Sequence, residues 1–200
     1  IVKPDVSGGS YGIEKSSVVE DGAQLRAQVA RLFSGDLHGR DFRRDGVVAE
    51  EFIDGPEFSV LVVGDWNRPD GIRVYPPVER FFADAWPKIL TYEINWERYG
   101  EDGPPENATA GFWHGKVESA DEKELTDLAR AAFVAAGGVG YGRVDIRRRK
   151  GGGTFAVLEV NANCGLSSDP HSSTVGAILS IHGVEFSSLL SDLLKRAVER

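Results

Sequence analysis

The run Lys150-Gly151-Gly152-Gly153 lies between two segments in which polar and apolar side chains alternate. Residues 142–148 and 154–161 have the length and the period-two pattern of β-strands. Glycines between two such segments are typical of a tight connection, so the pattern predicts an antiparallel hairpin. Because alternate side chains of a strand point to opposite faces, the hairpin also determines which residues share a face of the sheet.

A symmetric turn would place Asp145 opposite Glu159 and Arg143 opposite Asn161, because the members of each pair are equidistant from the glycines. These polar residues then form one patch on one face. The alternation assigns the remaining residues of both strands to the core: Val144, Ile146, Leu158 and Val160.

Two carboxylates that face each other across a ladder repel unless a cation lies between them. Asp145, Glu159 and the Asn161 amide supply oxygen ligands, which suit Mg²⁺ better than zinc. Since Mg²⁺ usually keeps positions for phosphate oxygens, the patch predicts a nucleotide, with Arg143 placed to stabilise charge on a transferring group. The alternative is a solvated face on which Arg143 and Asp145 neutralise each other.

Capping residues and apolar periodicity predict the other elements. Asp21 is a candidate N-cap for a helix over residues 21–33, with Leu25, Val29 and Leu32 on its apolar face. Residues 47–53 and 58–63 are interpreted as a second antiparallel hairpin, around Asp54-Gly55-Pro56.

Residues 64–115 are the least regular part, with short strands expected around residues 73–78 and 89–93. Ser119 and Glu122 form a candidate capping box for a helix that ends at Gly137-Gly138. The buried stripe of that helix is expected to be Leu125, Leu128, Ala132 and Phe133. Two closing helices are expected to bury Val175, Ile178 and Leu179, and then Phe186, Leu189, Leu190, Leu193 and Leu194.

Composition excludes several classes of protein. The 200 residues contain no apolar run near the ~18 residues that span a bilayer, which predicts no membrane partner. A net charge of −8 argues against a general nucleic-acid surface. The single cysteine, Cys164, predicts a reducing, cytoplasmic location and serves as a small packing residue. The absence of methionine and the start at Ile1 indicate a piece of a longer protein.

Four segments in order carry a family resemblance: VKPDVSGGSYG, EEFIDGPEFSVLVVG, GRVDIRRRKGGGTFAVLEVNANCGL and HGVEFSSLL. Together they resemble the ATP-grasp ligases, most closely the D-alanine-D-alanine ligase family. The resemblance implies an α+β fold, in which two subdomains with antiparallel sheets hold the nucleotide between them. It implies a small subdomain over residues 1–63, a larger one over residues 64–200, and an N-terminal substrate domain outside this sequence.

The resemblance also implies roles for individual residues. Lys3 would reach the nucleotide phosphates, and the glycine loop, residues 8–12, would cover them with its backbone amides. Within that loop it assigns nucleotide binding to Gly8, Gly9 and Ser10, and Ser10 also belongs to the catalytic group. Adenine would be held by Glu50, Glu51 and Ile53, the ribose by Glu57, and Mg²⁺ by Asp145, Glu159 and Asn161. Arg143 and Gly165 would bind the acyl phosphate and the tetrahedral intermediate.

Three departures from the family pattern concern the substrate half. Gly9 stands where the D-alanine ligases usually have the first of two consecutive serines, so only Ser10 remains. Asn95-Trp96 stands where they carry a lysine followed by a tyrosine. The segment after Gly165 is longer than in the family, which leaves open which of three serines meets a substrate carboxylate: Ser168, Ser172 or Ser173.

The implied reaction is an ATP- and Mg²⁺-dependent ligation of a carboxylate to an amine through an acyl phosphate, with amino-acid or peptide substrates. A homodimer is compatible with this interpretation, and the chain without its N-terminal domain is expected to be inactive or nearly so. The alternatives are a ligase with another acceptor, of the glutathione or ribosomal-tail type, a nucleotide-binding module without turnover, and a calcium-binding structural domain.

Overall fold

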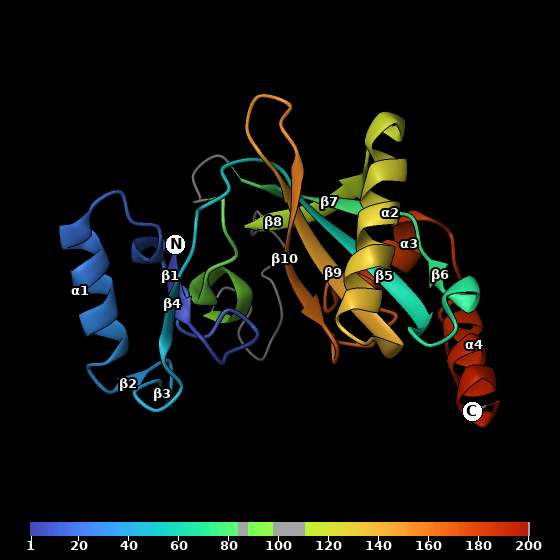
Figure 1. Ribbon diagram of the computed structural model, residues 1–200, viewed down its shortest axis with the longest axis horizontal. Helices are drawn as coiled ribbons and strands as arrows, with labels where there is room; N and C mark the ends of the chain where they lie inside the picture. Colours follow the sequence, from blue (N-terminus) through green and yellow to red (C-terminus); the bar gives the residue numbers. More distant parts are fainter. Residues whose placement is uncertain (84–87, 98–110, 200) are drawn as a thin grey trace. The chain divides into compact units, whose positions relative to one another are not determined.

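The computed structural model describes residues 1–83, 88–97 and 111–199. The chain forms two compact units: Ile1–Phe52 with Phe82–Phe112, and Ile53–Phe81 with Trp113–Arg200 (Figure 1). This division differs from the boundary predicted between residues 63 and 64, because strand β5, Glu57–Asp65, pairs along its whole length with strand β9, Val139–Arg148. The segment before residue 64 therefore contributes to both units.

The first unit contains helix α1, Gly22–Leu32, and the antiparallel pair β1, Val2–Pro4, with β4, Val47–Ala49. The predicted N-cap is confirmed, since the Asp21 side chain accepts hydrogen bonds from the amides of Ala23 and Gln24. The unit also holds the 3₁₀ turn Lys15–Ser17 and a short hairpin of β2, Asp36–Leu37, with β3, Arg40–Asp41. Its core is Val2, Leu32 and Phe42.

Residues 89–93 were expected to form a strand, and this prediction was wrong. The chain instead forms a short π-helix, Glu93–Glu97. The Thr91 hydroxyl accepts a hydrogen bond from the Ile94 amide, and the Thr91 carbonyl accepts one from the Asn95 amide. These bonds give the backbone a local alternative to strand pairing and bury Ile94 completely.

The sheet of the second unit has the strand order β10-β9-β5-β7-β8, with β6 paired beside β5. The pairings of β5 with β6, β7 and β9, and of β9 with β10, are all antiparallel. The remaining strands are β6 Arg73–Val74, β7 Val78–Phe82, β8 Phe112–Lys116 and β10 Phe155–Asn161.

The predicted hairpin of residues 47–53 with 58–63 was wrong. β4 pairs with β1 in the first unit, whereas β5 is the central strand of the other sheet. The sequence of β5 explains the difference: it is an almost unbroken apolar run and its residues from Glu57 to Gly64 are all buried. A strand of this kind needs cover on both faces and a neighbour on both sides.

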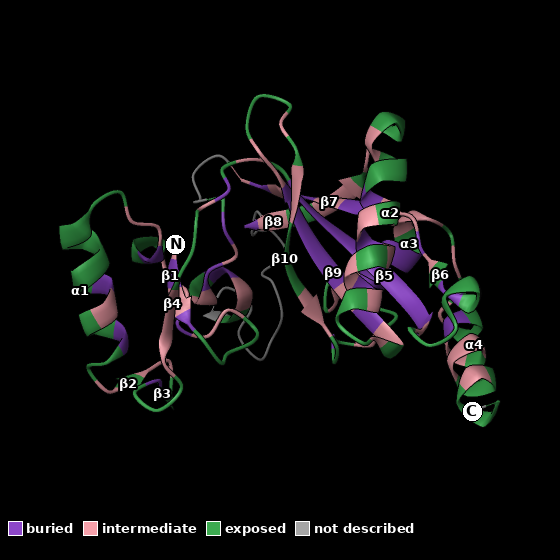
Figure 2. Ribbon diagram, in the orientation of Figure 1, coloured by how far each residue is buried: buried purple, intermediate pink, exposed green. Residues whose placement is uncertain are grey.

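Helices cover the two faces of the sheet (Figures 1 and 2). Helix α2, Ser119–Ala135, packs through Leu125, Ala129 and Phe133 on the face that carries Phe58, Val60 and Val62. The other face carries Leu61 and Val63 and is covered by helices α3, Thr174–Ile181, and α4, Phe186–Val198. The predicted helices are thus confirmed, but two residues of the predicted stripes are exposed: Leu25 of α1 at 36% and Leu194 of α4 at 68%.

The capping box predicted for α2 was wrong. Glu118 is the N-cap residue and makes no side-chain capping bond, so Ser119 lies inside the first turn. The predicted end is confirmed: Gly137 has a φ of +68°, and the Gly138 amide donates to the Phe133 carbonyl over 2.8 Å. Among the described residues, no single helix has the length and hydropathy to cross a membrane; α3 and α4 meet that test only as a pair, bent by 113°.

We predict that Phe133→Ala lowers the free energy of unfolding by about 3–5 kcal/mol, because the buried ring fills the space between α2 and the sheet. Urea denaturation measures the change. Lys123→Ala is the matched control on the same helix: it removes only an exposed ion pair with Asp127 and should leave the transition midpoint unchanged. Equal midpoints for Phe133→Ala and Lys123→Ala would contradict this account of the core.

Candidate functional site

A β-bulge in β10 determines which residues face each other in the hairpin. Next to the turn, Phe155 pairs with Arg148 and Val157 pairs with Ile146, one residue away from the symmetric alignment. The register then shifts between Val157 and Glu159. Leu158 is the extra residue and is 38% exposed, so its predicted place in the core was wrong.

Beyond the bulge, the predicted pairs are confirmed: Glu159 lies opposite Asp145, and Asn161 lies opposite Arg143. Val144 and Ile146 are buried and Val160 packs against the same core cluster, as predicted. The symmetric turn assumed in the prediction is absent. The bulge shifts the register by one residue and so produces the predicted pairs of Glu159 with Asp145 and of Asn161 with Arg143.

The polar residues extend across one face of the sheet. On the side of β5 away from α2, Glu57 and Ser59 precede Leu61 and Val63. β9 runs antiparallel to β5, so Arg147 and Asp145 lie opposite Glu57 and Ser59, while Arg143 and Tyr141 lie opposite Leu61 and Val63. This face therefore has a charged end and an apolar end, and the apolar end contributes to the core cluster that contains α3 and α4.

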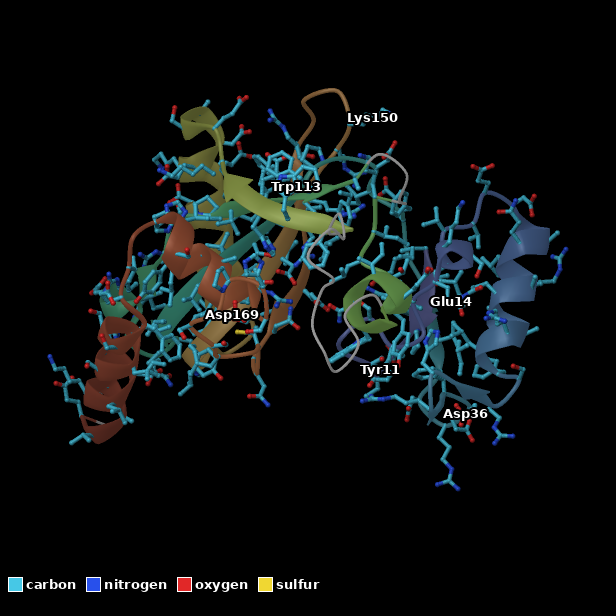
Figure 3. The ribbon with its side chains drawn as sticks, turned by 180° about the vertical axis from the view of Figure 1, so that it is seen from behind. Tyr11, Glu14, Asp36, Trp113, Lys150 and Asp169 are labelled. Carbon is cyan, nitrogen blue, oxygen red and sulfur yellow. The ribbon has the colours of Figure 1, made fainter. Side chains whose placement is uncertain are left out.

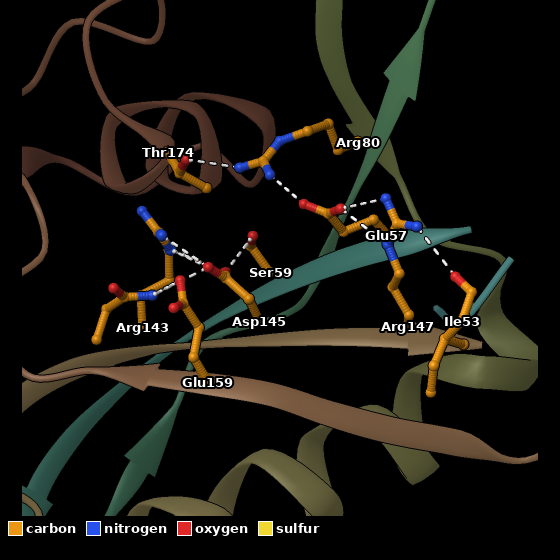
Figure 4. A network of polar contacts seen from close by, with 10 residues as sticks. Ile53, Glu57, Ser59, Arg80, Arg143, Asp145, Arg147, Glu159 and Thr174 are labelled. Atoms are coloured by element: carbon orange, nitrogen blue, oxygen red, sulfur yellow. Dashed lines mark hydrogen bonds and ion pairs between the residues drawn. The ribbon is translucent and has the colours of Figure 1, made fainter. Parts of the chain in front are cut away.

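Asp145 is at the centre of the charged end (Figure 4). It is 4% exposed, accepts from the Ser59 hydroxyl over 2.7 Å, and accepts from Nε and Nη2 of Arg143 over 2.8 and 2.7 Å. The ion pair that the alternative interpretation expected is thus present. Burial alone would raise the pKa of Asp145, but the Arg143 charge and hydrogen bonds outweigh it and the pKa is lowered. Asp145 is therefore a carboxylate at neutral pH.

Asn161 connects the two predicted acidic ligands. Its Nδ2 atom donates to Asp145 over 3.0 Å and to Glu159 over 2.8 Å. The amide thus lies between two carboxylates, where a cation would lie. Rotating the amide by 180° would present its oxygen instead, giving three oxygen donors of the kind that Mg²⁺ prefers.

These side chains fit a magnesium ion in donor type and in position. Within the described ranges, no group of three or more histidine, cysteine or acidic side chains could hold a metal. A cation at this end of the sheet would therefore depend on Asp145, Glu159 and the Asn161 amide together. It would also compete with Arg143 for the oxygens of Asp145.

A second charged group surrounds Glu57. Its carboxylate pairs with Arg80 of β7 and accepts from Arg147 over 2.8 and 3.0 Å. Arg147 also donates to the Ile53 carbonyl over 3.0 Å, and Arg80 donates to the Thr174 hydroxyl over 3.4 Å. Both oxygens of Glu57 thus accept from arginines in this structure, and its role toward a ribose stays a prediction.

Sequence reasoning missed Arg80 and Arg147 as members of this group. Arg147 alternates with Asp145 and Arg143 along one strand, which is the signal that could have identified it. No comparable signal exists for Arg80, because its contact depends on the pairing of β5 with β7, which the sequence pattern did not predict.

The first unit brings together two other predicted residues. Lys3 and Glu50 form an ion pair of 2.7 Å, so the lysine expected at the phosphates contacts an acid expected at the adenine. Glu51 is exposed in the same unit. Gly9 and Ser10 of the glycine loop both have a φ near +62°, as the loop's backbone freedom suggested.

The three candidate serines after Gly165 differ in their contacts. Ser173 is the N-cap of α3 and accepts from the Gly176 amide over 2.9 Å. Ser172 donates to the Ser167 hydroxyl over 2.9 Å, whereas Ser168 is exposed. Cys164 packs in the core cluster under α3 and α4 with its thiol pKa raised by burial, which confirms its packing role.

Two α+β units, an antiparallel sheet with an acidic hairpin, and a glycine loop after a short strand define the class of this protein: it has the ATP-grasp fold. A family model described as D-ala D-ala ligase C-terminus matches residues 1–195. The chain belongs to that family.

Relatives and solved structures agree. A D-alanine--D-alanine ligase of Marinomonas sp. (strain MWYL1) is 32% identical over 200 residues, which is 100% of this chain and 53% of the relative. A D-alanine--D-alanine ligase structure from Bacillus anthracis has a TM-score of 0.67 at 22% identity, covering 99% of this chain and 54% of that one. The VanG D-Ala:D-Ser ligase from Enterococcus faecalis has a TM-score of 0.65 at 22% identity, covering 98% and 48%. The chain thus spans about half the length of the curated relative.

His114 of β8 provides a pH test of the charged end. Burial, followed by the charges of Arg80 and Arg143, lowers its pKa to about 3, whereas Asp145 acts in the opposite direction. The His114 imidazole binds a proton more strongly in the unfolded chain than in the folded one, so its protonation favours unfolding. The contribution of neutral His114 to the free energy of unfolding is therefore complete above the ordinary pKa of about 6.5 and declines as the pH falls toward 3.

We predict that His114→Gln loses less stability than the wild type between about pH 7 and about pH 4.5, because the variant lacks this group. Urea unfolding at both pH values measures the difference. The matched control is His171→Gln in an exposed loop, which should follow the wild-type profile. An identical pH dependence of His114→Gln and wild type would show that the surroundings of His114 do not lower its pKa.

Proposed function

We propose that this chain is the nucleotide-binding part of an ATP-dependent carboxylate-amine ligase that resembles D-alanine-D-alanine ligase. The observation that supports it most is the convergence of Asp145, Glu159 and Asn161 at the charged end of the sheet. Family membership supports the reaction class. A solved structural neighbour, the D-alanine--D-alanine ligase from Bacillus anthracis with 20% identity and a TM-score of 0.60, is complexed with ATP; it covers 90% of this chain and 49% of that one.

Asp145, Glu159 and Asn161 would hold Mg²⁺, which supplies charge neutralisation for the phosphates when it is bound. The low pKa of Asp145 supports this role, because no proton has to leave before the carboxylate can accept a metal. Arg143 stays protonated: burial would lower its pKa, but Asp145 raises it. A bound metal would give Asp145 a new partner, and the phosphates of a nucleotide would give Arg143 one.

The reaction proposed is the attack of a substrate carboxylate on the γ-phosphate of ATP, followed by displacement of phosphate by an amine. In this scheme Arg143 stabilises the negative charge of the transferring group and of the tetrahedral intermediate. Lys3 and the glycine loop with Ser10 hold the phosphates, and the Gly165 backbone approaches the reacting carbonyl. Catalysis then depends on positioning and charge, with no covalent enzyme intermediate.

The remaining assignments belong to the same proposal. The adenine ligands are Glu50, Glu51 and Ile53, and the ribose ligand is Glu57. The substrates are amino acids or peptides, an additional domain supplies the rest of their pocket, the location is cytoplasmic, and a homodimer is compatible with the proposal. A nucleotide-binding module without turnover is the second candidate, favoured by Asn95 where the family pattern has a lysine.

We predict that the full-length protein releases phosphate from ATP in the presence of an amino-acid pair, and that Glu159→Gln lowers kcat by at least about 100-fold through loss of a charged metal ligand. A coupled phosphate assay measures both. Glu124→Gln, which makes the same charge change on the exposed side of α2, is the matched control and should retain activity.

Nucleotide binding without phosphate release for any amine would support the module. A melting temperature that does not respond to ATP with Mg²⁺ would contradict nucleotide binding altogether.

A further inference from the structure

Two of the departures from the family pattern contact each other in the first unit, although they are far apart in the sequence. The Trp96 indole Nε1 donates to the Gly9 carbonyl over 2.6 Å, and the Asn95 amide donates to the same oxygen over 3.2 Å. The indole also lies over the glycine itself: a Cβ atom at Gly9 would be 3.2 Å from Cζ2 of Trp96. The residues that replace lysine and tyrosine thus contact the residue that replaces serine.

The same segment also contacts the glycine loop around Tyr11, which is labelled in Figure 3. The Tyr11 ring packs edge-on against Tyr92, with centroids 5.0 Å apart, and lies 5.9 Å from the ring of Trp96. The Tyr92 amide donates to the Ile13 carbonyl over 2.9 Å. Residues 92–96 therefore contact the loop from Gly9 to Ile13.

The contact has a directional consequence for the backbone of the loop. In a trans peptide the carbonyl oxygen and the following N–H point to opposite sides. Two donors that hold the Gly9 oxygen toward residues 92–96 therefore turn the Ser10 N–H the other way. Gly9 and Ser10 also both have a left-handed φ of 62°, and the Tyr11 amide donates to the Gly8 carbonyl over 3.4 Å, so residues 8–11 form a tight turn with a defined peptide orientation.

We propose that Asn95 and Trp96 are positioning residues for the glycine loop, which orient the Gly9–Ser10 peptide so that its N–H can bind nucleotide phosphate. This inference rests on the proposed nucleotide-binding function. In this chain the pair acts by donating hydrogen bonds to the loop, so that Asn95 does not replace the positive charge of a lysine.

The proposal also explains why Gly9 and Trp96 occur together. A serine at position 9 would have to adopt a φ of +62°, which is unfavourable for a residue with a side chain, and its Cβ would lie 3.2 Å from the indole. A tyrosine at position 96 lacks the indole N–H that reaches the Gly9 oxygen. A serine at position 9 alone, or a tyrosine at position 96 alone, is therefore unfavourable in this chain. With both substitutions together, the serine no longer crowds the indole.

The test compares Trp96→Phe with wild type in the full-length protein, by the KM for ATP, by kcat, and by hydrogen exchange of residues 8–12 without nucleotide. Loss of one hydrogen bond should raise the KM about two- to tenfold, leave kcat less affected, and speed exchange in the loop. Trp66→Phe is the matched control, because Trp66 is 46% exposed and Trp96 is 48% exposed, and it should change none of these values.

A double-mutant cycle adds a second readout. Gly9→Ser and Trp96→Tyr should each raise the KM for ATP, and the double variant should raise it by less than the product of the single effects. Multiplicative effects would overturn the coupling between the two positions.

The outcomes separate this proposal from the function on which it rests. Unchanged loop exchange in Trp96→Phe would overturn the contact itself, whether or not ATP binds. Faster exchange with an unchanged KM would overturn the positioning role. A wild-type protein that binds no ATP would refute the proposed function and the positioning role together, and the exchange data would still decide whether Trp96 holds the loop.

Discussion

The β-bulge at Leu158 is the constraint on which the candidate site depends. Without it, the pairing next to the turn would continue along the hairpin and place Asp145 opposite Leu158. Glu159 and Asn161 would then move to the face that packs under α2, because a shift of one residue exchanges the two faces of a strand. One extra residue in β10 therefore gathers the acids and the amide beside Arg143, at the cost of an exposed leucine.

The charged end of the sheet combines two groups that are each costly to bury. Asp145 is compensated by Arg143 and Ser59, and Glu57 lies between Arg80 and Arg147. Buried ion pairs contribute little net stability compared with apolar residues of the same size. These two groups lie on the same face of the sheet, next to its apolar end under α3 and α4. Charged residues at such a position are consistent with a binding surface for a charged ligand. The family to which the chain belongs supports a nucleotide as that ligand.

Local patterns predicted the elements whose signals lie within a few residues. The hairpin around the glycine turn, the Asp21 cap and the end of α2 at Gly137 are of this kind. Long-range pairing decided the error in the second predicted hairpin. β4 joined β1, and β5 became a central strand, because its apolar run required cover on both faces. The bulge and the Thr91 hydrogen bonds that turn residues 93–97 into a π-helix left no pattern in the alternation of side chains.

The central claim is that Asp145, Glu159 and Asn161 bind the metal of a bound nucleotide. Its most direct test is anomalous diffraction from crystals of the full-length protein grown with Mn²⁺ and a non-hydrolysable ATP analogue. We expect one Mn²⁺ peak at about 2.0–2.4 Å from oxygens of all three side chains, with the Asn161 amide rotated and Arg143 moved toward the phosphates. A metal bound elsewhere, with Asp145 still paired to Arg143 and bridged by Asn161, would contradict the account.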